Sequence, residues 1–258
     1  MNQNILFLGL GEVGNSVLGL YNPLQVLSGV YNLYFRDLTA VTDKAVNIEE
    51  LKDYINIDVL HVSIPYSQAF KDIVIDYIKK YKPSLTLIHS TVDIGTTRAI
   101  AEQSVGIVAH TPVMGVHPTL TKSMQTFRKI VGIIKAEDKE TIMRHLSSIK
   151  VIPDFYNTPE DSEAAKMMST TYYGHNIRFM QDVHKFCEEQ DLDFEKVYTR
   201  TNEIYNRGYT EMEMPNVRRP VLKYTPGKIG GHCVVPNAEL LSDRFELAKE
   251  LVEHNDNL

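Results

Sequence analysis

The sequence predicts an α/β fold in two parts: a doubly wound parallel sheet, followed by an all-α domain built on a long helix. In the first 153 residues, short runs rich in Val, Ile and Leu alternate with segments of helical spacing, as in strands joined by crossover helices. From residue 160 to about residue 206 there is no proline, and apolar residues recur every three or four positions. We therefore predict two domains, 1–155 and 156–258.

The apolar runs predict strands over 5–9, 32–35, 59–64, 85–89, 106–109, 129–134 and 150–152. Helical spacing predicts helices between them over 67–80, 96–103 and 139–148, then a long helix over 159–190 and another over 194–206. Residues 207–236 are rich in proline and glycine, which predicts an irregular loop, and an amphipathic helix over 240–253 follows it.

Composition excludes several classes of protein. Hydrophobic residues make up 43% and charged residues 23%, which is ordinary for a globular protein, and the net charge of −6 implies no broad basic surface for nucleic acid. No apolar run approaches the roughly 20 residues that span a bilayer, and the N-terminus lacks the basic region of a signal peptide. Two cysteines cannot form a framework of disulfides, so we expect a cytoplasmic setting, and without zinc-finger spacing we expect no metal.

Residues 5–14, ILFLGLGEVG, predict a dinucleotide site of the Rossmann type, because a strand is followed by G-x-G-x-x-G and a helical pattern. Gly9 permits the tight turn, Gly11 lets the pyrophosphate approach the backbone, and Gly14 lets the helix pack on the strand. The first helical turn, with Glu12 and Val13, offers free N–H groups to the phosphates. A strand–turn–helix without a ligand is the alternative.

Asp37 decides which dinucleotide is expected. It ends a second strand, 23 residues after Gly14, where a carboxylate accepts hydrogen bonds from the adenosine ribose hydroxyls. We therefore predict NAD rather than NADP, although Arg36 beside it could bind a 2′-phosphate.

Residues 226–237, PGKIGGHCVVPN, place Cys233 in a glycine-rich loop just before a C-terminal helix. A loop thiol beside Gly230 and Gly231 is open to a substrate, and a thiolate is a strong nucleophile. A small apolar residue in a loop is the alternative.

Together with the dinucleotide motif, four further segments resemble the UDP-glucose/GDP-mannose (nucleotide-sugar) dehydrogenase family. Residues 58–65 (DVLHVSIP) resemble its strand beside the nicotinamide, and residues 89–97 (HSTVDIGTT) its S-T-V-x-x-G-T-T motif. Residues 163–170 (EAAKMMST) resemble the start of its central helix, and residues 230–233 (GGHC) its thiol loop. The resemblance covers nearly the whole chain and implies a truncated form, without the family's third, C-terminal domain.

The resemblance implies oxidation of a sugar's primary alcohol by NAD in two hydride transfers. Cys233 would form a thiohemiacetal with the aldehyde, Lys166 would stabilise developing oxyanions, and Thr91 would position a water molecule. Ile64, Pro65 and Thr91 would contact the cofactor. A solvated helix lysine and a cap for the following helix are the alternatives for Lys166 and Thr91.

The chain departs from the family's pattern at four positions. Thr170 stands where the family has asparagine, and Asn237 stands where it has aspartate. Val113 and His117 replace two glutamates, and only the histidine can move protons near neutral pH. We keep Thr170, Asn237 and His117 as candidate catalytic residues, with a purely solvated loop histidine as the alternative for His117. The first hydride transfer needs the fewest of these groups.

The loop before the thiol motif predicts substrate contacts, because arginine binds phosphate and tyrosine stacks on bases. The candidates are Tyr209, Arg218, Arg219, Lys223, Gly230 and Gly231, with solvated surface charge as the alternative.

Two other functions stay open. A β-hydroxyacid dehydrogenase would also pair a dinucleotide domain with a helix lysine, although it would lack the thiol loop. A non-catalytic NAD-binding protein would suit the changes at Val113, Thr170 and Asn237. Finally, an apolar stripe on the long helix predicts a homodimer through that helix; its members are Ala164, Met167, Met168, Thr171 and Ile177.

Overall fold

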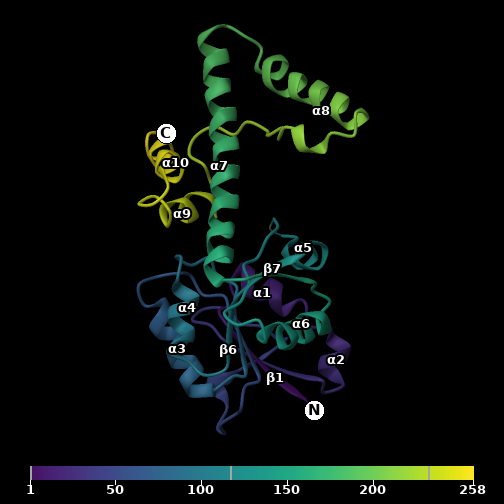
Figure 1. The fold of residues 1–258 in the computed structure, drawn as a ribbon, viewed down its shortest axis with the longest axis vertical. Coiled ribbons are helices and arrows are strands. Elements are labelled where there is room, and N and C mark those ends of the chain that lie inside the picture. Colours follow the sequence, from purple (N-terminus) through teal and green to yellow (C-terminus); the bar gives the residue numbers. More distant parts are fainter. Residues whose placement is uncertain (1, 117, 232) are drawn as a thin grey trace. The chain divides into compact units, whose positions relative to one another are not determined.

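The computed structural model describes residues 2–116, 118–231 and 233–258 (Figure 1). The chain divides into two compact units, Met1–Lys166 and Met167–Leu258, each with its own packing.

An eight-stranded sheet forms the centre of the first unit, in the order β3-β2-β1-β4-β5-β6-β7-β8. Its strands are β1 (Gln3–Leu8), β2 (Tyr31–Arg36), β3 (Val46–Asn47), β4 (Val59–Val62), β5 (Leu85–Ile88), β6 (Ile107–His110), β7 (Lys129–Gly132) and β8 (Pro153–Tyr156). The paired strands run parallel except β6 and β7, which meet antiparallel at His110 and Gly132. The predicted doubly wound α/β fold is confirmed, with one antiparallel step that the sequence did not predict.

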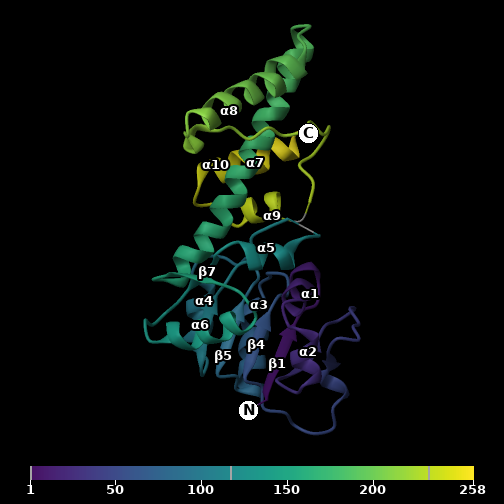
Figure 2. The ribbon, with the colours of Figure 1, turned by 90° about the vertical axis from the view of Figure 1, so that its right-hand side faces the viewer.

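Helices cover both faces of this sheet (Figures 1 and 2). The helical elements of the unit are α1 (Glu12–Leu18), α2 (Pro23–Leu27), η1 (Ile48–Glu50), α3 (Phe70–Tyr81), α4 (Thr96–Ala101), α5 (Leu120–Thr126) and α6 (Asp138–Ser148). Along β1, Ile5 and Phe7 pack into the core with α1, α5 and α6, while Leu6 and Leu8 pack into the core with α3 and α4. Because both faces are buried there, the strand is apolar from Ile5 to Leu8, which is why its sequence predicted a parallel sheet.

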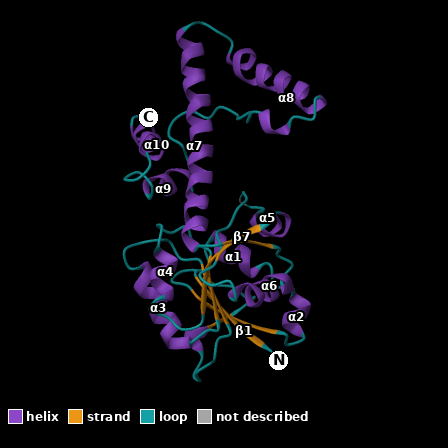
Figure 3. Ribbon diagram, in the orientation of Figure 1, coloured by secondary structure: helices purple, strands orange, loops and turns teal. Residues whose placement is uncertain are grey.

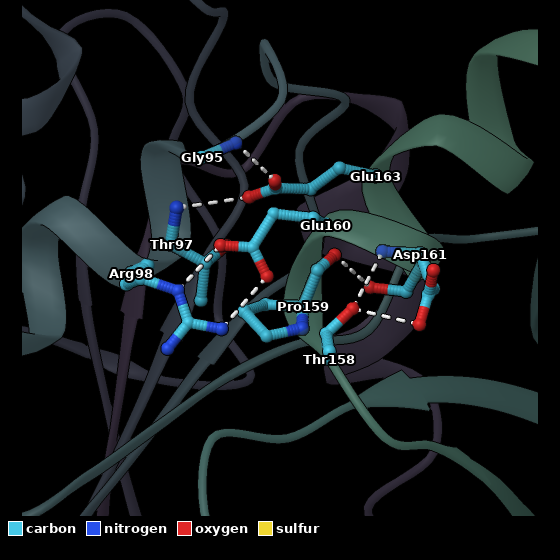
Figure 4. Close-up of polar contacts among 9 residues, drawn as sticks. Gly95, Thr97, Arg98, Thr158, Pro159, Glu160, Asp161 and Glu163 are labelled. Carbon is cyan, nitrogen blue, oxygen red and sulfur yellow. Dashed lines mark hydrogen bonds and ion pairs between the residues drawn. The ribbon is translucent and has the colours of Figure 1, made fainter.

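The start of α7 (Pro159–Glu189) follows from its local sequence (Figure 4). The Thr158 hydroxyl accepts a hydrogen bond from the Asp161 backbone N–H at 3.1 Å and donates to the Asp161 carboxylate at 2.7 Å. Pro159 lacks the N–H that a first helical position leaves unpaired, and Glu160 complements the positive end of the helix dipole. The predicted helix over 159–190 is confirmed to within one residue.

The second unit is helical (Figure 3). After the part of α7 that it contains come a π-helical segment η2 (Glu195–Arg200), α8 (Thr201–Glu211), the short η3 (Pro215–Val217), α9 (Val234–Glu239) and α10 (Glu246–Asp256). The packing is close at Gly174 on α7: a Cβ there would lie 2.3 Å from Leu251 Cδ2 and 2.7 Å from Val234 Cγ1. Both C-terminal helices therefore pack against the same point of α7.

Several sequence-based boundaries differ from the structure. The strand expected over 150–152 is β8, three residues later, because Lys150 takes a left-handed conformation (φ 61°) after α6. The helix expected over 240–253 is α10, which begins six residues later at Glu246, because the backbone is extended at Phe245. The pattern also missed β3, α2 and α5, which are too short to show a period. Among the helices in the described part of the chain, none is both long and apolar enough to cross a membrane.

Candidate functional site

Several candidate residues follow neighbouring parallel strands and so meet at one edge of the sheet. The loop that begins at Gly9 follows β1, Ile64 and Pro65 follow β4, and Thr91 follows β5. These strands are adjacent in the order β1-β4-β5. After β1 the chain adds β2 and β3 on one side of it and then β4 and β5 on the other side, so the strand order reverses between β1 and β4. The crevice outside the carboxyl ends at such a reversal is where doubly wound sheets bind nucleotides.

The three glycines of the first loop have distinct structural reasons. Gly9 has φ 91°, and a Cβ there would lie 2.8 Å from the Ser63 carbonyl. A Cβ on Gly14 would lie 1.9 Å from the Gly9 carbonyl oxygen, so the tight turn itself requires glycine at both ends. Gly11, which precedes α1, has a φ of −62°, and a Cβ there would meet nothing within 4 Å. The fold therefore leaves space at Gly11, as a site for an approaching pyrophosphate requires.

Asp37 is held by backbone donors. Its carboxylate accepts from Leu10 N at 2.6 Å, Ala40 N at 2.7 Å and Thr39 N at 2.9 Å. Burial pushes the pKa of Asp37 upward, but these three N–H groups outweigh it and lower the pKa below its usual value. Arg36 pairs with Glu49 at 2.7 Å. The carboxylate thus stays charged, and the arginine beside it already has an anionic partner.

A buried carboxylate joins the loop after β5 to the base of α7 (Figure 4). Glu163 is fully buried, and its two oxygens accept from Gly95 N at 2.6 Å and Thr97 N at 2.8 Å, at the start of α4. Burial raises the pKa of Glu163, although these N–H donors oppose the rise. Arg98 adds a bidentate ion pair with Glu160, at 2.6 and 2.9 Å. The candidate loop is therefore fixed against the helix turn that leads to Lys166.

Three successive carbonyls after β6 accept hydrogen bonds from three different elements. Thr111 O is 3.0 Å from His89 Nδ1, Pro112 O accepts from Lys129 Nζ at 3.0 Å, and Val113 O accepts from Lys166 Nζ at 2.9 Å. Lys129 is buried, and desolvation, with the charge of Lys166, lowers its pKa to about 7. The segment that carries the candidate acid–base positions is thus held by its backbone.

Val113, the candidate position of that segment that the structure describes, has no group that can transfer a proton. Val113 is buried in the core and packs with residues of α5 and α6. His117, the other candidate in this segment, lies outside the described residues.

A buried histidine cluster lies beneath the same segment. His61 Nδ1 is 2.8 Å from His89 Nε2, and His61 Nε2 is 2.7 Å from the Tyr21 hydroxyl, which is 3.2 Å from His145 Nε2. His110 separately contacts the Ser162 hydroxyl at 2.7 Å. No group of three His, Cys, Asp or Glu side chains in the described ranges is arranged to hold a metal ion.

In the second unit, Cys233 is exposed and directly precedes α9, whereas Cys187 is buried. The two departures from the family's pattern contact each other, because Asn237 Nδ2 donates to Thr170 Oγ1 at 3.2 Å. An amide–hydroxyl pair thus connects α9, one turn after the thiol, to α7. Neither group changes charge near neutral pH.

The candidate substrate residues do not form one cluster. Lys223 and Gly230 line a cavity of about 350 Å³ against Ile177 and Met180 of α7. Arg219 instead stacks on Tyr205, with the guanidinium carbon 3.8 Å from the ring centroid and 6.0 Å from that of Tyr209. Arg218 and Gly231 are exposed. Because Arg219 stacks on Tyr205, a structural role fits it better than the substrate contact expected from the sequence.

Sequence reasoning missed several residues that hold the candidate groups: Lys129, Glu163, Gln181 and Asn255. A lysine inside an otherwise apolar strand was a visible signal at Lys129, and Glu163 stood in the quoted EAAK segment. Nothing in the sequence marked the others. Lys166 and Cys233 lie in different units, so their convergence on one cofactor stays a prediction.

No protein-family model and no curated protein matches the chain. Solved structures do match: a UDP-D-ManNAc dehydrogenase from Pyrococcus horikoshii has a TM-score of 0.72 at 18% identity, covering 99% of this chain and 68% of that one. A UDP-glucose dehydrogenase from the archaeon Pyrobaculum islandicum has a TM-score of 0.70 at 14% identity, covering 100% and 68%. A 3-hydroxyisobutyrate dehydrogenase from Mycobacterium tuberculosis has a TM-score of 0.68 at 14% identity, covering 98% and 92%.

The chain has the fold of these dehydrogenases. At such low identity the likeness shows the fold alone. This fold agrees with the resemblance to nucleotide-sugar dehydrogenases that the motifs indicated.

Proposed function

We propose that the protein is an NAD-dependent oxidoreductase that acts on the primary alcohol of a nucleotide-linked sugar. The observation that carries the proposal is the sheet edge where the Gly9–Gly14 loop, Asp37 and Thr91 meet, with Glu163 fixing that edge to the helix of Lys166. The matched fold of nucleotide-sugar dehydrogenases supports it. Two cysteines without a disulfide suit the reducing cytoplasm, which we propose as its location.

The residues of the sheet edge fit NAD. Open space at Gly11 suits a pyrophosphate, and the charged Asp37 suits ribose hydroxyls. Arg36, the group that would favour a 2′-phosphate, is paired with Glu49. NAD bound there would accept a hydride from the substrate carbon.

Two glycine variants test the cofactor site. Gly11→Ala fits the fold but adds a methyl group where the pyrophosphate would approach, so we expect the Kd for NAD to rise about tenfold or more with an unchanged Tm. Gly14→Ala places a Cβ against the Gly9 carbonyl, so we expect it to lower the Tm. Calorimetric titration with NAD and NADP and thermal denaturation measure both; wild-type NAD affinity in Gly11→Ala would refute the assignment.

The chemistry we propose uses two residues of this chain. The Lys166 ammonium stabilises the alkoxide and the developing oxyanions, since a fixed charge needs no reorganisation. Cys233 Sγ, as the thiolate, adds to the aldehyde carbon while the oxygen takes up a proton, which gives a thiohemiacetal. Transfer of a hydride from that adduct to a second molecule of NAD, with loss of the hydroxyl proton, would give a thioester, and hydrolysis by water would release the acid and the thiol.

Substitution of these residues separates the two oxidations. We expect Lys166→Ala to lower kcat about a hundredfold or more, as loss of an oxyanion donor does. Cys233→Ala removes the thiohemiacetal, so the NADH formed per sugar falls from two to one and the aldehyde accumulates. NADH absorbance with a panel of UDP- and GDP-sugars measures both, with Cys187→Ala as the matched control. Turnover of every sugar at the wild-type rate by both variants would refute the roles.

A β-hydroxyacid dehydrogenase is the second candidate, supported by the matched fold of a 3-hydroxyisobutyrate dehydrogenase, 92% of which the chain covers. The exposed thiol in a glycine-rich loop favours the first candidate. NADH formation from a small 3-hydroxy acid, unaffected by Cys233→Ala, would favour the second. NAD binding with no turnover of either class would favour a binding protein.

We also propose that two copies pair through α7. The stripe named from the sequence is only partly available, because Met167 and Thr171 are buried. Exposed apolar side chains instead recur every seven residues at Tyr172, Phe179 and Phe186, which places them on one helix face. Sedimentation at micromolar concentration should therefore give a dimer for the wild type and a monomer for Phe179→Glu. Val105→Glu, also at an exposed apolar residue, should remain dimeric; a monomeric wild type would refute the pairing.

A further inference from the structure

The thiol of Cys233 is fixed on its C-terminal side by α9. The Cys233 carbonyl accepts from Asn237 N at 3.2 Å, and the next residue, Val234, packs where Gly174 lets α9 approach α7. Ala238 is fully buried. The helix that starts at the thiol therefore has a set position within the second unit.

The chain that leads to the thiol is also held, from residue 219 onward. Asn206 makes a reciprocal pair with the Arg219 backbone, at 2.8 Å in both directions. The Tyr198 hydroxyl accepts from Leu222 N at 3.2 Å, and the Tyr224 ring stacks on His184 with centroids 3.5 Å apart. This loop has many prolines and glycines, but side chains of the helices hold its backbone.

Two side chains, one from α7 and one from α10, hold the described residues shortly before the thiol. Gln181 Nε2 donates to the Gly227 carbonyl at 2.9 Å, and Asn255 Oδ1 accepts from Ile229 N at 2.6 Å. Gln181, Asn255 and Ile229 are all buried. A buried backbone N–H needs an acceptor, so Asn255 is the group that keeps this point of the loop in place.

Beyond Ile229 the glycines have no such contacts. A Cβ on Gly230 or Gly231 would meet nothing within 4 Å, and Gly231 has φ 88°, a conformation that glycine adopts freely. Among the residues that the structure describes, Asn255 is thus the last side-chain anchor on this side, and it acts at Ile229, four residues before Cys233. The α9 packing is the first anchor on the other side.

We propose that Asn255, supported by Gln181, is a positioning residue for the Cys233 thiol. The proposal rests on the proposed function, in which Cys233 attacks the aldehyde. Attack requires the sulfur to be held within a fraction of an ångström of one geometry. If the loop is free at one end, a smaller fraction of the molecules has the sulfur in that geometry, while substrate binding is unaffected. The role belongs to the acceptor oxygen of Asn255, which an aspartate would supply at the same place.

The test compares Asn255→Asp, which keeps the acceptor, with Asn255→Leu, which has the same size and lacks it. We expect Asn255→Asp to keep kcat within about twofold of the wild type and Asn255→Leu to lower kcat about tenfold, with KM in both within about threefold. Hydrogen exchange on the intact protein gives a readout without turnover. The amides from Ile229 to Gly231 should exchange about tenfold faster or more in Asn255→Leu, while those of α9 stay as slow as in the wild type.

The outcomes separate the two proposals. Faster exchange in Asn255→Leu alone, in a protein that turns over no sugar, would sustain the anchoring and refute the nucleotide-sugar function. Wild-type kcat in Asn255→Leu, or equal losses in the Asp and Leu variants, would overturn the positioning role. If Asn255→Leu does not fold, Gln181→Met removes the neighbouring donor to Gly227, and it is expected to lower kcat and speed exchange in the same direction; no effect there would also overturn it.

Discussion

Acidification below about pH 6 is expected to destabilise the protein steeply, because the first unit buries four neutral histidines. Desolvation lowers the pKa of His110 to about 3 and that of His145 to about 4. It also lowers the pKa values of His61 and His89, and the neighbouring histidines and Lys129 oppose their charged forms further. Each ring therefore binds a proton at a higher pH in the unfolded chain than in the folded chain.

The sign of the effect follows from proton counting. An unfolded histidine titrates near pH 6.5, so below that value the unfolded chain binds protons that the folded chain does not. The free energy of unfolding therefore decreases as the pH decreases. Between about pH 6.5 and 5 each histidine contributes a loss of roughly 1.5 kcal/mol, so the four together cost roughly 6 kcal/mol. That is comparable to the whole stability of an ordinary domain, so unfolding is expected near pH 5.

One variant isolates a single proton. The Gln side chain in His145→Gln can still place an amide near the Tyr21 hydroxyl, which His145 Nε2 contacts at 3.2 Å, but it does not titrate. Urea unfolding from pH 4.5 to 7.5, followed by circular dichroism, should show a shallower acid slope by about one proton in this variant. His175→Gln, which replaces a histidine bonded to the Leu247 carbonyl in the second unit, is the control and should keep the wild-type slope. A flat wild-type profile between pH 7 and 5 would contradict the account.

Local pattern was enough to predict most of the fold. Strands with two buried faces read as apolar runs, and a proline-free stretch of helical spacing predicted α7 to within one residue. The features of the fold that the sequence did not predict depend on contacts between residues far apart in the chain. The antiparallel pairing of β7 with β6, for example, cannot be inferred from either strand alone. A short apolar run does not indicate whether its neighbour in the sheet runs parallel or antiparallel to it.

The candidate site divides in the same way. The glycines of the first loop and Asp37 could be predicted, because their chemistry needs fixed residue types at fixed spacing. Glu163 and Asn255 could not be assigned a role, since each acts on a backbone N–H that is 66 and 26 residues away, respectively. The sequence also offered no means to see that Thr170 and Asn237 contact each other, although both stand out as departures from the family's pattern.

Lys129→Met is expected to stabilise the protein at neutral pH, an unusual outcome for a substitution in a sheet core. Lys129 lies buried in β7, and desolvation lowers its pKa from 10.5 to about 7, with a further contribution from the charge of Lys166. Methionine has a similar length and no charge to bury. Replacement of a buried ionic group by an apolar one of like size is often stabilising.

Between about pH 7 and 10.5 the unfolded chain holds a proton on this lysine that the folded chain has released, so stability rises with pH by about 1.4 kcal/mol per unit. Over that window the lowered pKa corresponds to roughly 5 kcal/mol, all of which opposes folding below pH 7. The variant loses the hydrogen bond to Pro112 O, which costs about 1–2 kcal/mol. The net gain at pH 7 is therefore roughly 3 kcal/mol.

Denaturant unfolding from pH 6.5 to 9.5 measures both the gain and the change in slope. Lys129→Met should lose about one proton of pH dependence, whereas Lys122→Met, at an exposed lysine, should retain the wild-type slope. Activity supplies a second comparison, because Lys129 and Lys166 hold adjacent carbonyls. If the Lys129 contact positions the segment after β6, the more stable variant should have a lower kcat, as expected where a site retains strain for function. A variant less stable than the wild type at every pH would show that the ammonium is better solvated in the fold than its burial implies.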